Sequence, residues 1–117
     1  MKELEEVVEL KNGLEYQNIR NDLLTQLSTA KIKGKHYTDL VEDYMSLWIT
    51  KNLLIQDINS RGVSIAWNNG GGQCGRKKND SVSELTKVNA QMLKLLNELG
   101  LKPADSIKNV DDEDDEL

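Results

Sequence analysis

The chain has 117 residues, which predicts one domain with or without tails, and its 15 basic and 20 acidic residues give a formal net charge of −5. This acidity argues weakly against a nucleic-acid binder, because such proteins usually carry a basic excess. The single cysteine, Cys74, excludes an internal disulfide framework, and with the single histidine, His36, it cannot form a Cys/His zinc site within one chain. No stretch approaches the roughly 18 apolar residues that span a bilayer, so no membrane segment is predicted.

Residues 1–13 are predicted to be a flexible acidic segment. The first nine residues hold one base against four acids, and Asn12-Gly13 interrupts any regular pattern. From Leu14 onward, apolar residues recur at spacings of three and four, which predicts a helix over about 14–30. A single helical domain is expected to occupy residues 14–103.

A basic turn follows this helix and contains Lys31, Lys33 and Lys35, which we call the loop cluster. A long central helix is then predicted over about 36–59, and its apolar stripe is wider than one neighbouring helix covers. Either this helix is central in the monomer, or one of its faces meets another subunit. The candidate residues for subunit contacts are Tyr44, Leu47, Trp48 and Ile55, with burial inside one chain as the alternative.

Residues 63–79 are predicted to form a small β-hairpin. Residues 63–67 are rich in β-branched and aromatic side chains, which is typical of a strand. A glycine-rich turn follows at residues 68–72. The returning strand ends in Arg76, Lys77 and Lys78, which we call the hairpin cluster.

The last helix has the clearest end signals. Ser81 followed by Glu84 has the pattern of a capping box and predicts a helix over about 82–99 with Ser81 as its cap. Gly100 is expected to end this helix in a left-handed conformation. Residues 104–117 are predicted to be a disordered acidic tail. The sequence therefore predicts a mainly α fold, a three-helix domain with a long central helix and a small β-hairpin before the last helix.

No set of residues combines a nucleophile, a base and oxyanion donors, so no enzymatic activity, cofactor or metal is predicted. Gly70 and Gly75 have the spacing of a phosphate-binding loop, but Arg76 and Lys77 stand where such a loop has lysine and Ser or Thr. Cys74 is interpreted as an incidental thiol.

The negative charge is distributed unevenly along the chain. Without the six acids of residues 111–117, 15 bases face 14 acids, and residues 31–102 hold 11 bases against 7 acids. Both basic clusters are candidate DNA contacts, because Lys and Arg displace counterions from phosphates. Three charges in a loop are also typical of a solvated surface. If several copies form a ring, each weak contact is repeated and strengthened by multivalency.

The chain ends in an acidic run, defined here as residues 111–116. Its members are Asp111, Asp112, Glu113, Asp114, Asp115 and Glu116. One interpretation is a solubilising end. The other is a partner-binding segment that docks on a basic partner or mimics DNA and competes for the protein's own basic patches.

Several short segments over residues 36–105 occur together in a characteristic order. They are Leu40-Val41-Glu42-Asp43-Tyr44, Asp57-Ile58, Arg61-Gly62-Val63, Lys77-Lys78-Asn79, Ser81-Val82-Ser83-Glu84-Leu85, Asn89-Ala90-Gln91 and Leu99-Gly100-Leu101-Lys102-Pro103-Ala104-Asp105. In order and spacing the chain resembles the small terminase subunits of tailed bacteriophages. Asn79-Asp80 stands where that family often has Asn-Pro, and Asp also suits the start of a helix.

The resemblance implies a non-enzymatic partner of a viral DNA-packaging motor in the host bacterial cytoplasm. Such subunits form ring-shaped homo-oligomers, engage double-stranded viral DNA at the packaging start site, and recruit or regulate the large subunit, which carries ATPase and nuclease activity. The N-terminal region lacks a helix-turn-helix pattern, so no separate sequence-reading domain is predicted. Two alternatives remain: a helical adaptor that binds only protein, and a small DNA-binding transcription regulator.

Overall fold

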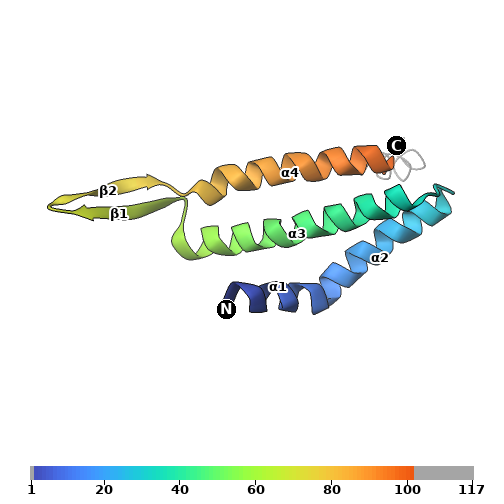
Figure 1. Cartoon of the computed structure of the whole chain (residues 1–117), viewed down its shortest axis with the longest axis horizontal. Coiled ribbons are helices and arrows are strands. Elements are labelled where there is room, and N and C mark those ends of the chain that lie inside the picture. Colours follow the sequence, from blue (N-terminus) through green and yellow to red (C-terminus); the bar gives the residue numbers. More distant parts are fainter. Residues whose placement is uncertain (1, 102–117) are drawn as a thin grey trace, which may run out of the picture.

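Four helices and a two-stranded hairpin make up residues 2–101, the part of the chain that the computed structural model describes. The elements are α1 (Lys2–Asn12), α2 (Leu14–Thr29), α3 (Lys35–Arg61), β1 (Ser64–Gly70), β2 (Gln73–Lys78) and α4 (Asp80–Leu99). Helices α3 and α4 run antiparallel, and the hairpin that joins them projects beyond one end of the pair (Figure 1). The predicted mainly α fold, with a long helix and a hairpin before the last helix, is confirmed. The predicted tail, residues 104–117, lies outside the described residues.

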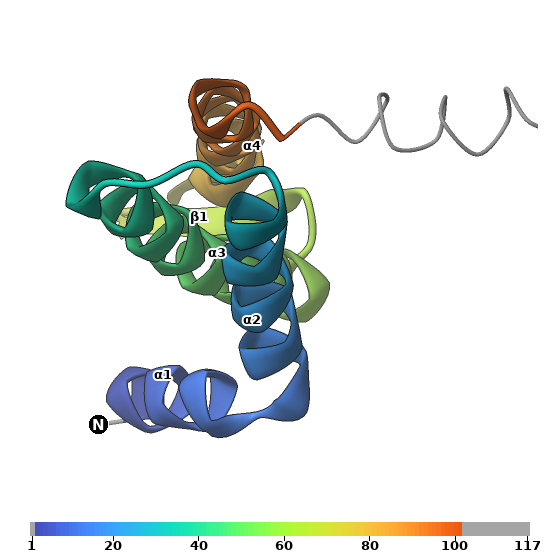
Figure 2. The same cartoon turned by 90° about the vertical axis from the view of Figure 1, so that its right-hand side faces the viewer.

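The central position of α3 follows from its wide apolar stripe. Val41, Met45, Trp48 and Ile49 recur at helical spacing and are all buried. Helix α4 lies on one side of α3 and α1 on the other, with α2 alongside (Figure 2). These neighbours supply the remaining buried apolar residues, which are Tyr16, Leu23 and Leu27 from α2 and Met92 and Leu99 from α4.

Helix α1 is the main departure from the sequence prediction, which had three helices and a flexible segment over residues 1–13. Val7 and Leu10, three residues apart, pack against the buried core and so hold this short helix in place. Its ends also suit the helix dipole, with acidic side chains in the first turn and Lys11 in the last. Gly13 has an extended conformation, with φ −77° and ψ 160°, and changes the direction of the chain between α1 and α2. The chain is therefore helical on both sides of Gly13.

The hairpin pairs β1 and β2 antiparallel, with Ser64 opposite Lys78 and Trp67 opposite Gly75. Its turn needs left-handed backbone, and residues 70–72, all glycine, have φ values of 83°, 58° and 83°. The Trp67 indole lies across Gly75, where an added Cβ would be 3.1 Å from Trp67 Cζ2. The hairpin therefore has its own small packing contact at a distance from the helical core.

Both ends of α4 have well-formed caps, but the N-terminal cap is Asn79 and not the predicted Ser81. Asn79 Oδ1 accepts a hydrogen bond from the Ser81 backbone N–H at 3.0 Å, and the helix begins at Asp80. Ser81 lies inside the helix, and its hydroxyl donates to Asp57 Oδ2 at 2.7 Å. At the other end the prediction is confirmed: Gly100 has φ 77°, and the Leu101 N–H donates to the Leu96 carbonyl at 3.0 Å.

Candidate nucleic-acid interface

The hairpin cluster is exposed, but its three members do not share one face. Successive side chains of a strand point to opposite faces. Arg76 and Lys78, which stand opposite Ala66 and Ser64 in the register, therefore lie on one face, and Lys77 lies on the other. The cluster that is continuous in sequence is thus divided between two sides of the hairpin.

Arg76 is fixed against the neighbouring strand. Its Nε donates to Ser64 Oγ at 3.0 Å and its Nη2 donates to the Ser64 carbonyl at 2.7 Å. These bonds hold the guanidinium in one orientation while the side chain stays exposed. A shallow groove at the base of the hairpin is lined by the whole hairpin cluster with Val63, Ser64 and Val82.

The loop cluster lies at the other end of α3. Lys31, Lys33 and Lys35 are exposed in the connection between α2 and α3. The 27 residues of α3 separate this connection from the hairpin. At 1.5 Å per residue they extend over about 40 Å. The structure therefore keeps the two basic clusters apart, at opposite ends of its longest helix (Figure 1).

A polar junction joins α3, the hairpin and α4 and sets the direction of the hairpin. We define the junction as Asp57, Arg61, Asn79 and Ser81. Arg61 Nε and Nη2 donate to the two Asp57 carboxylate oxygens at 2.7 and 2.9 Å. Asn79, which is fully buried, donates from Nδ2 to the Gly62 carbonyl at 2.9 Å and to Asp57 at 3.1 Å. Its backbone N–H also donates to the Val63 carbonyl at 2.8 Å.

The junction lowers the pKa of Asp57 well below its ordinary value of 3.8. The hydrogen bonds from Arg61 have the largest effect, followed by those from Ser81 and Asn79, because all of them favour the ionised carboxylate. Asp57, Arg61 and Ser81 belong to the short segments that carry the resemblance to the terminase family, but nothing in the sequence predicts that these three residues meet. The pairing of residues more than 20 positions apart gives no periodic signal in the sequence.

The depressed pKa of Asp57 predicts a loss of stability in acid. Its contribution is present above the unfolded pKa, near 3.8, and is lost as the pH falls from there toward the lower folded value. We expect the free energy of unfolding to fall between pH 6 and pH 3, and to fall less in Asp57→Asn, which has no carboxylate to protonate. Urea denaturation at both pH values measures this. Asp43→Asn, an exposed acid of the same helix, is the control and is expected to keep the wild-type loss.

The residues predicted to contact another subunit differ in exposure. Trp48 is only 8% exposed and packs edge-on against Tyr16, with ring centroids 5.7 Å apart. Tyr44, Leu47 and Ile55 are half-buried. Burial raises the pKa of Tyr44. Trp48 thus belongs to the core of the single chain, while the other three keep part of their surface available for a partner.

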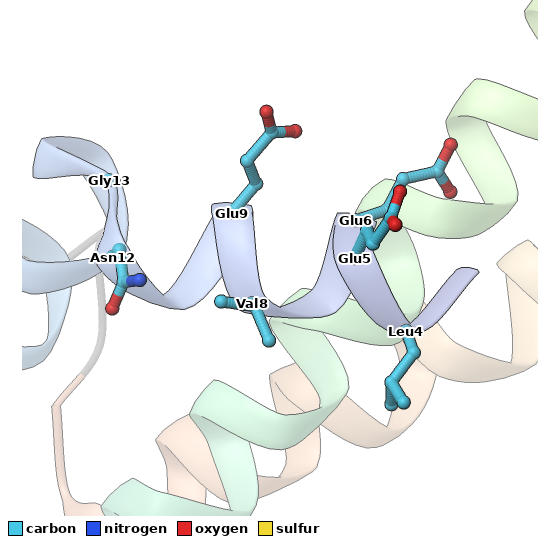
Figure 3. Close-up of a pocket in the computed structure, with 7 residues that line it drawn as sticks. All are labelled: Leu4, Glu5, Glu6, Val8, Glu9, Asn12 and Gly13. Carbon is cyan, nitrogen blue, oxygen red and sulfur yellow. The ribbon is translucent and has the colours of Figure 1, made fainter. Parts of the chain in front are cut away.

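Helix α1 carries an exposed apolar face that sequence analysis did not single out. Leu4 and Val8 are 63% and 53% exposed and project from one side of α1, and the carboxylates of Glu5, Glu6 and Glu9 project from the other (Figure 3). The spacing of four between Leu4 and Val8 is the signal that marks this face. It makes α1 a second candidate surface for contacts between copies.

Neither a metal site nor a membrane span is found among residues 2–101. No group of three or more His, Cys, Asp or Glu side chains in this range is placed to hold a metal ion. None of its helices combines the length and apolar character needed to cross a membrane. Cys74 is a free, exposed thiol on β2.

The described residues define a mainly helical protein with basic clusters at two separate ends and an acidic helix beside its core. Residues 17–116 match the family described as phage terminase, small subunit, and the chain belongs to this family. The terminase small subunit is a non-catalytic packaging component. The family that the sequence resembles is thereby confirmed, over a longer stretch than residues 36–105. No curated protein and no solved structure matches the chain.

Proposed function

We propose that the chain engages double-stranded viral DNA at the packaging start site and recruits or regulates the terminase large subunit, which carries ATPase and nuclease activity. In this proposal the chain acts as a ring-shaped homo-oligomer in the host bacterial cytoplasm. The acidic run, residues 111–116, contacts the large subunit. Membership of the phage terminase small subunit family supports the proposal as a whole.

The observation that carries the DNA contact is the placement of the two basic clusters. Both are exposed, and the length of α3 separates them by about 40 Å. One turn of B-DNA measures about 34–36 Å. A duplex running along one subunit would therefore meet both clusters about one turn apart, which suits contacts to the phosphate backbone without reading of the bases.

The proposed ring rests on the surfaces that one chain leaves uncovered. Tyr44, Leu47 and Ile55 are half-buried, and Leu4 and Val8 of α1 are exposed. Closed rings require two different surfaces on each subunit that complement each other. Each copy in such a ring would add a further pair of basic clusters, and the repeated weak contacts would raise the overall affinity for DNA.

Salt-dependent binding to a packaging-site duplex tests the DNA contact. We expect charge reversal of the hairpin cluster (Arg76→Glu, Lys77→Glu, Lys78→Glu) or of the loop cluster (Lys31→Glu, Lys33→Glu, Lys35→Glu) to lower the affinity about tenfold or more at low salt. The dependence of log affinity on log salt should also become shallower, by up to about 0.9 for each lost phosphate contact. Fluorescence anisotropy over a salt series measures both quantities.

The matched control reverses three exposed lysines outside both clusters, Lys11, Lys87 and Lys94. It is expected to change affinity less than either cluster variant. Undetectable binding of the wild-type protein at low salt would contradict the DNA contact and favour a protein-only adaptor. Light scattering distinguishes the other alternative, because a transcription regulator that reads a palindrome is expected to be a dimer and a terminase ring a larger closed oligomer.

A further inference from the structure

The groove between the end of α2 and the start of α3 combines basic and apolar side chains. It has a volume of about 1020 Å³ and is lined by the whole loop cluster together with apolar residues that include Leu24, Ile32 and Tyr37. No acidic side chain is among the residues that line it. This lining is complementary to a peptide segment that carries several carboxylates, because each lysine ammonium gains a charge-assisted partner there.

The described part of the chain ends beside this groove. Gly100 caps α4 at a point where an added Cβ would lie 4.0 Å from Ile32 Cδ1. Leu101 and Ile32 both pack against the same core. Since Ile32 also lines the groove, residues 102–117 continue the chain from a point next to the loop cluster.

We infer that the acidic run, residues 111–116, binds this groove and pairs with the loop cluster. Residues 102–110 form a nine-residue connection from Leu101 to the run. Such a connection spans at most about 30 Å when fully extended. The groove lies well within this reach, and a short tether gives the run an effective concentration of the order of millimolar.

The length of the connection also selects between the two basic clusters. The hairpin cluster lies beyond the far end of α4, whose 20 residues extend over about 30 Å. The connection would have to be fully extended to bring the run there within one chain, which is entropically costly. The loop cluster is therefore the favoured site.

Occupancy of the groove has a consequence that rests on the proposed function. The acidic run would neutralise the loop cluster and compete with DNA phosphates for it, leaving the hairpin cluster free. Binding of the large subunit to the run would then expose the loop cluster. The docking itself does not depend on DNA and is tested without it.

Zero-length cross-linking with a carbodiimide tests the docking in the full-length protein. We expect mass spectrometry to find amide bonds that join lysines of the loop cluster to residues 111–116, and these links should decrease in high salt because ion pairs are screened. Lys87 and Lys94, exposed on α4, are the internal controls and are expected to link to the run less often. Links from the run chiefly to Lys77 and Lys78, or no links, would overturn the inference. So would links from the loop cluster chiefly to Glu5, Glu6 and Glu9, which would make α1 of a second copy the occupant.

DNA affinity provides a second readout in the same full-length chain. We expect neutralising the run, by Asp→Asn and Glu→Gln at residues 111–116, to raise affinity for a duplex about threefold or more at low salt. This gain should disappear when Lys31→Gln, Lys33→Gln and Lys35→Gln are added, and should persist with Lys87→Gln and Lys94→Gln. An equal gain in both backgrounds would indicate a general charge effect and contradict the inference. Absence of DNA binding in every variant would contradict the proposed function, and the cross-links would still decide what occupies the groove.

Discussion

Replacing Asn79 by alanine is expected to lower the free energy of unfolding by about 2–4 kcal/mol. Asn79 is fully buried and is the only described residue that both caps α4 and bonds to α3. Its loss removes the cap and leaves the Gly62 carbonyl and the Ser81 N–H without their side-chain partner. Urea denaturation at a fixed protein concentration measures the change, since any self-association adds to apparent stability.

Two further variants separate the contributions of this side chain. Asn69→Ala, at an exposed position near the hairpin tip, is the matched control and is expected to change stability by less than about 0.5 kcal/mol. Asn79→Asp keeps the acceptor of the cap but loses the donor to Gly62 and places a second carboxylate beside Asp57. We expect it to be destabilised as well. If Asn79→Ala unfolds at the wild-type urea concentration, the junction does not contribute to stability as argued.

Replacing Met45 by alanine is expected to lower the free energy of unfolding by about 2–5 kcal/mol. Met45 is fully buried in the middle of α3, where several helices converge on the core, so truncation leaves a cavity that neighbouring helices fill only partly. Leu93→Ala on α4, where the side chain is 61% exposed, removes a similar apolar volume from the surface and is the control. Equal effects of the two substitutions would mean that α3 is not the centre of the core.

Local sequence patterns predicted most of the helical framework correctly. The apolar periods of α2, α3 and α4 reflect burial of one face and therefore place these helices to within a few residues. Gly100 was correctly predicted to end α4, because a left-handed residue followed by an apolar contact is a local requirement. The hairpin followed from its glycine-rich turn.

The features that were missed depend on contacts between distant residues. Helix α1 is short, and only the packing of Val7 and Leu10 against other helices stabilises it. The cap of α4 is Asn79, whose side chain is held by bonds to Asp57 and to the Gly62 carbonyl, 22 and 17 positions away in the sequence. The hairpin cluster is continuous in sequence but divided in space, because strand geometry alternates the direction of its side chains.

The hairpin is attached to the helices by a different kind of contact from the one that holds the helices to each other. The apolar core holds α2, α3 and α4 together, whereas at its base the hairpin is fixed to them through hydrogen bonds of the polar junction. Protonation of Asp57 weakens the bonds that its carboxylate accepts from Arg61, Asn79 and Ser81 and leaves the apolar contacts unchanged. Because these bonds hold the pKa of Asp57 well below 3.8, this protonation requires strong acid. Strong acid, and not mild acid, should therefore loosen the hairpin at its base. A subunit built in this way has a rigid helical domain and a hairpin whose orientation can change independently of that domain.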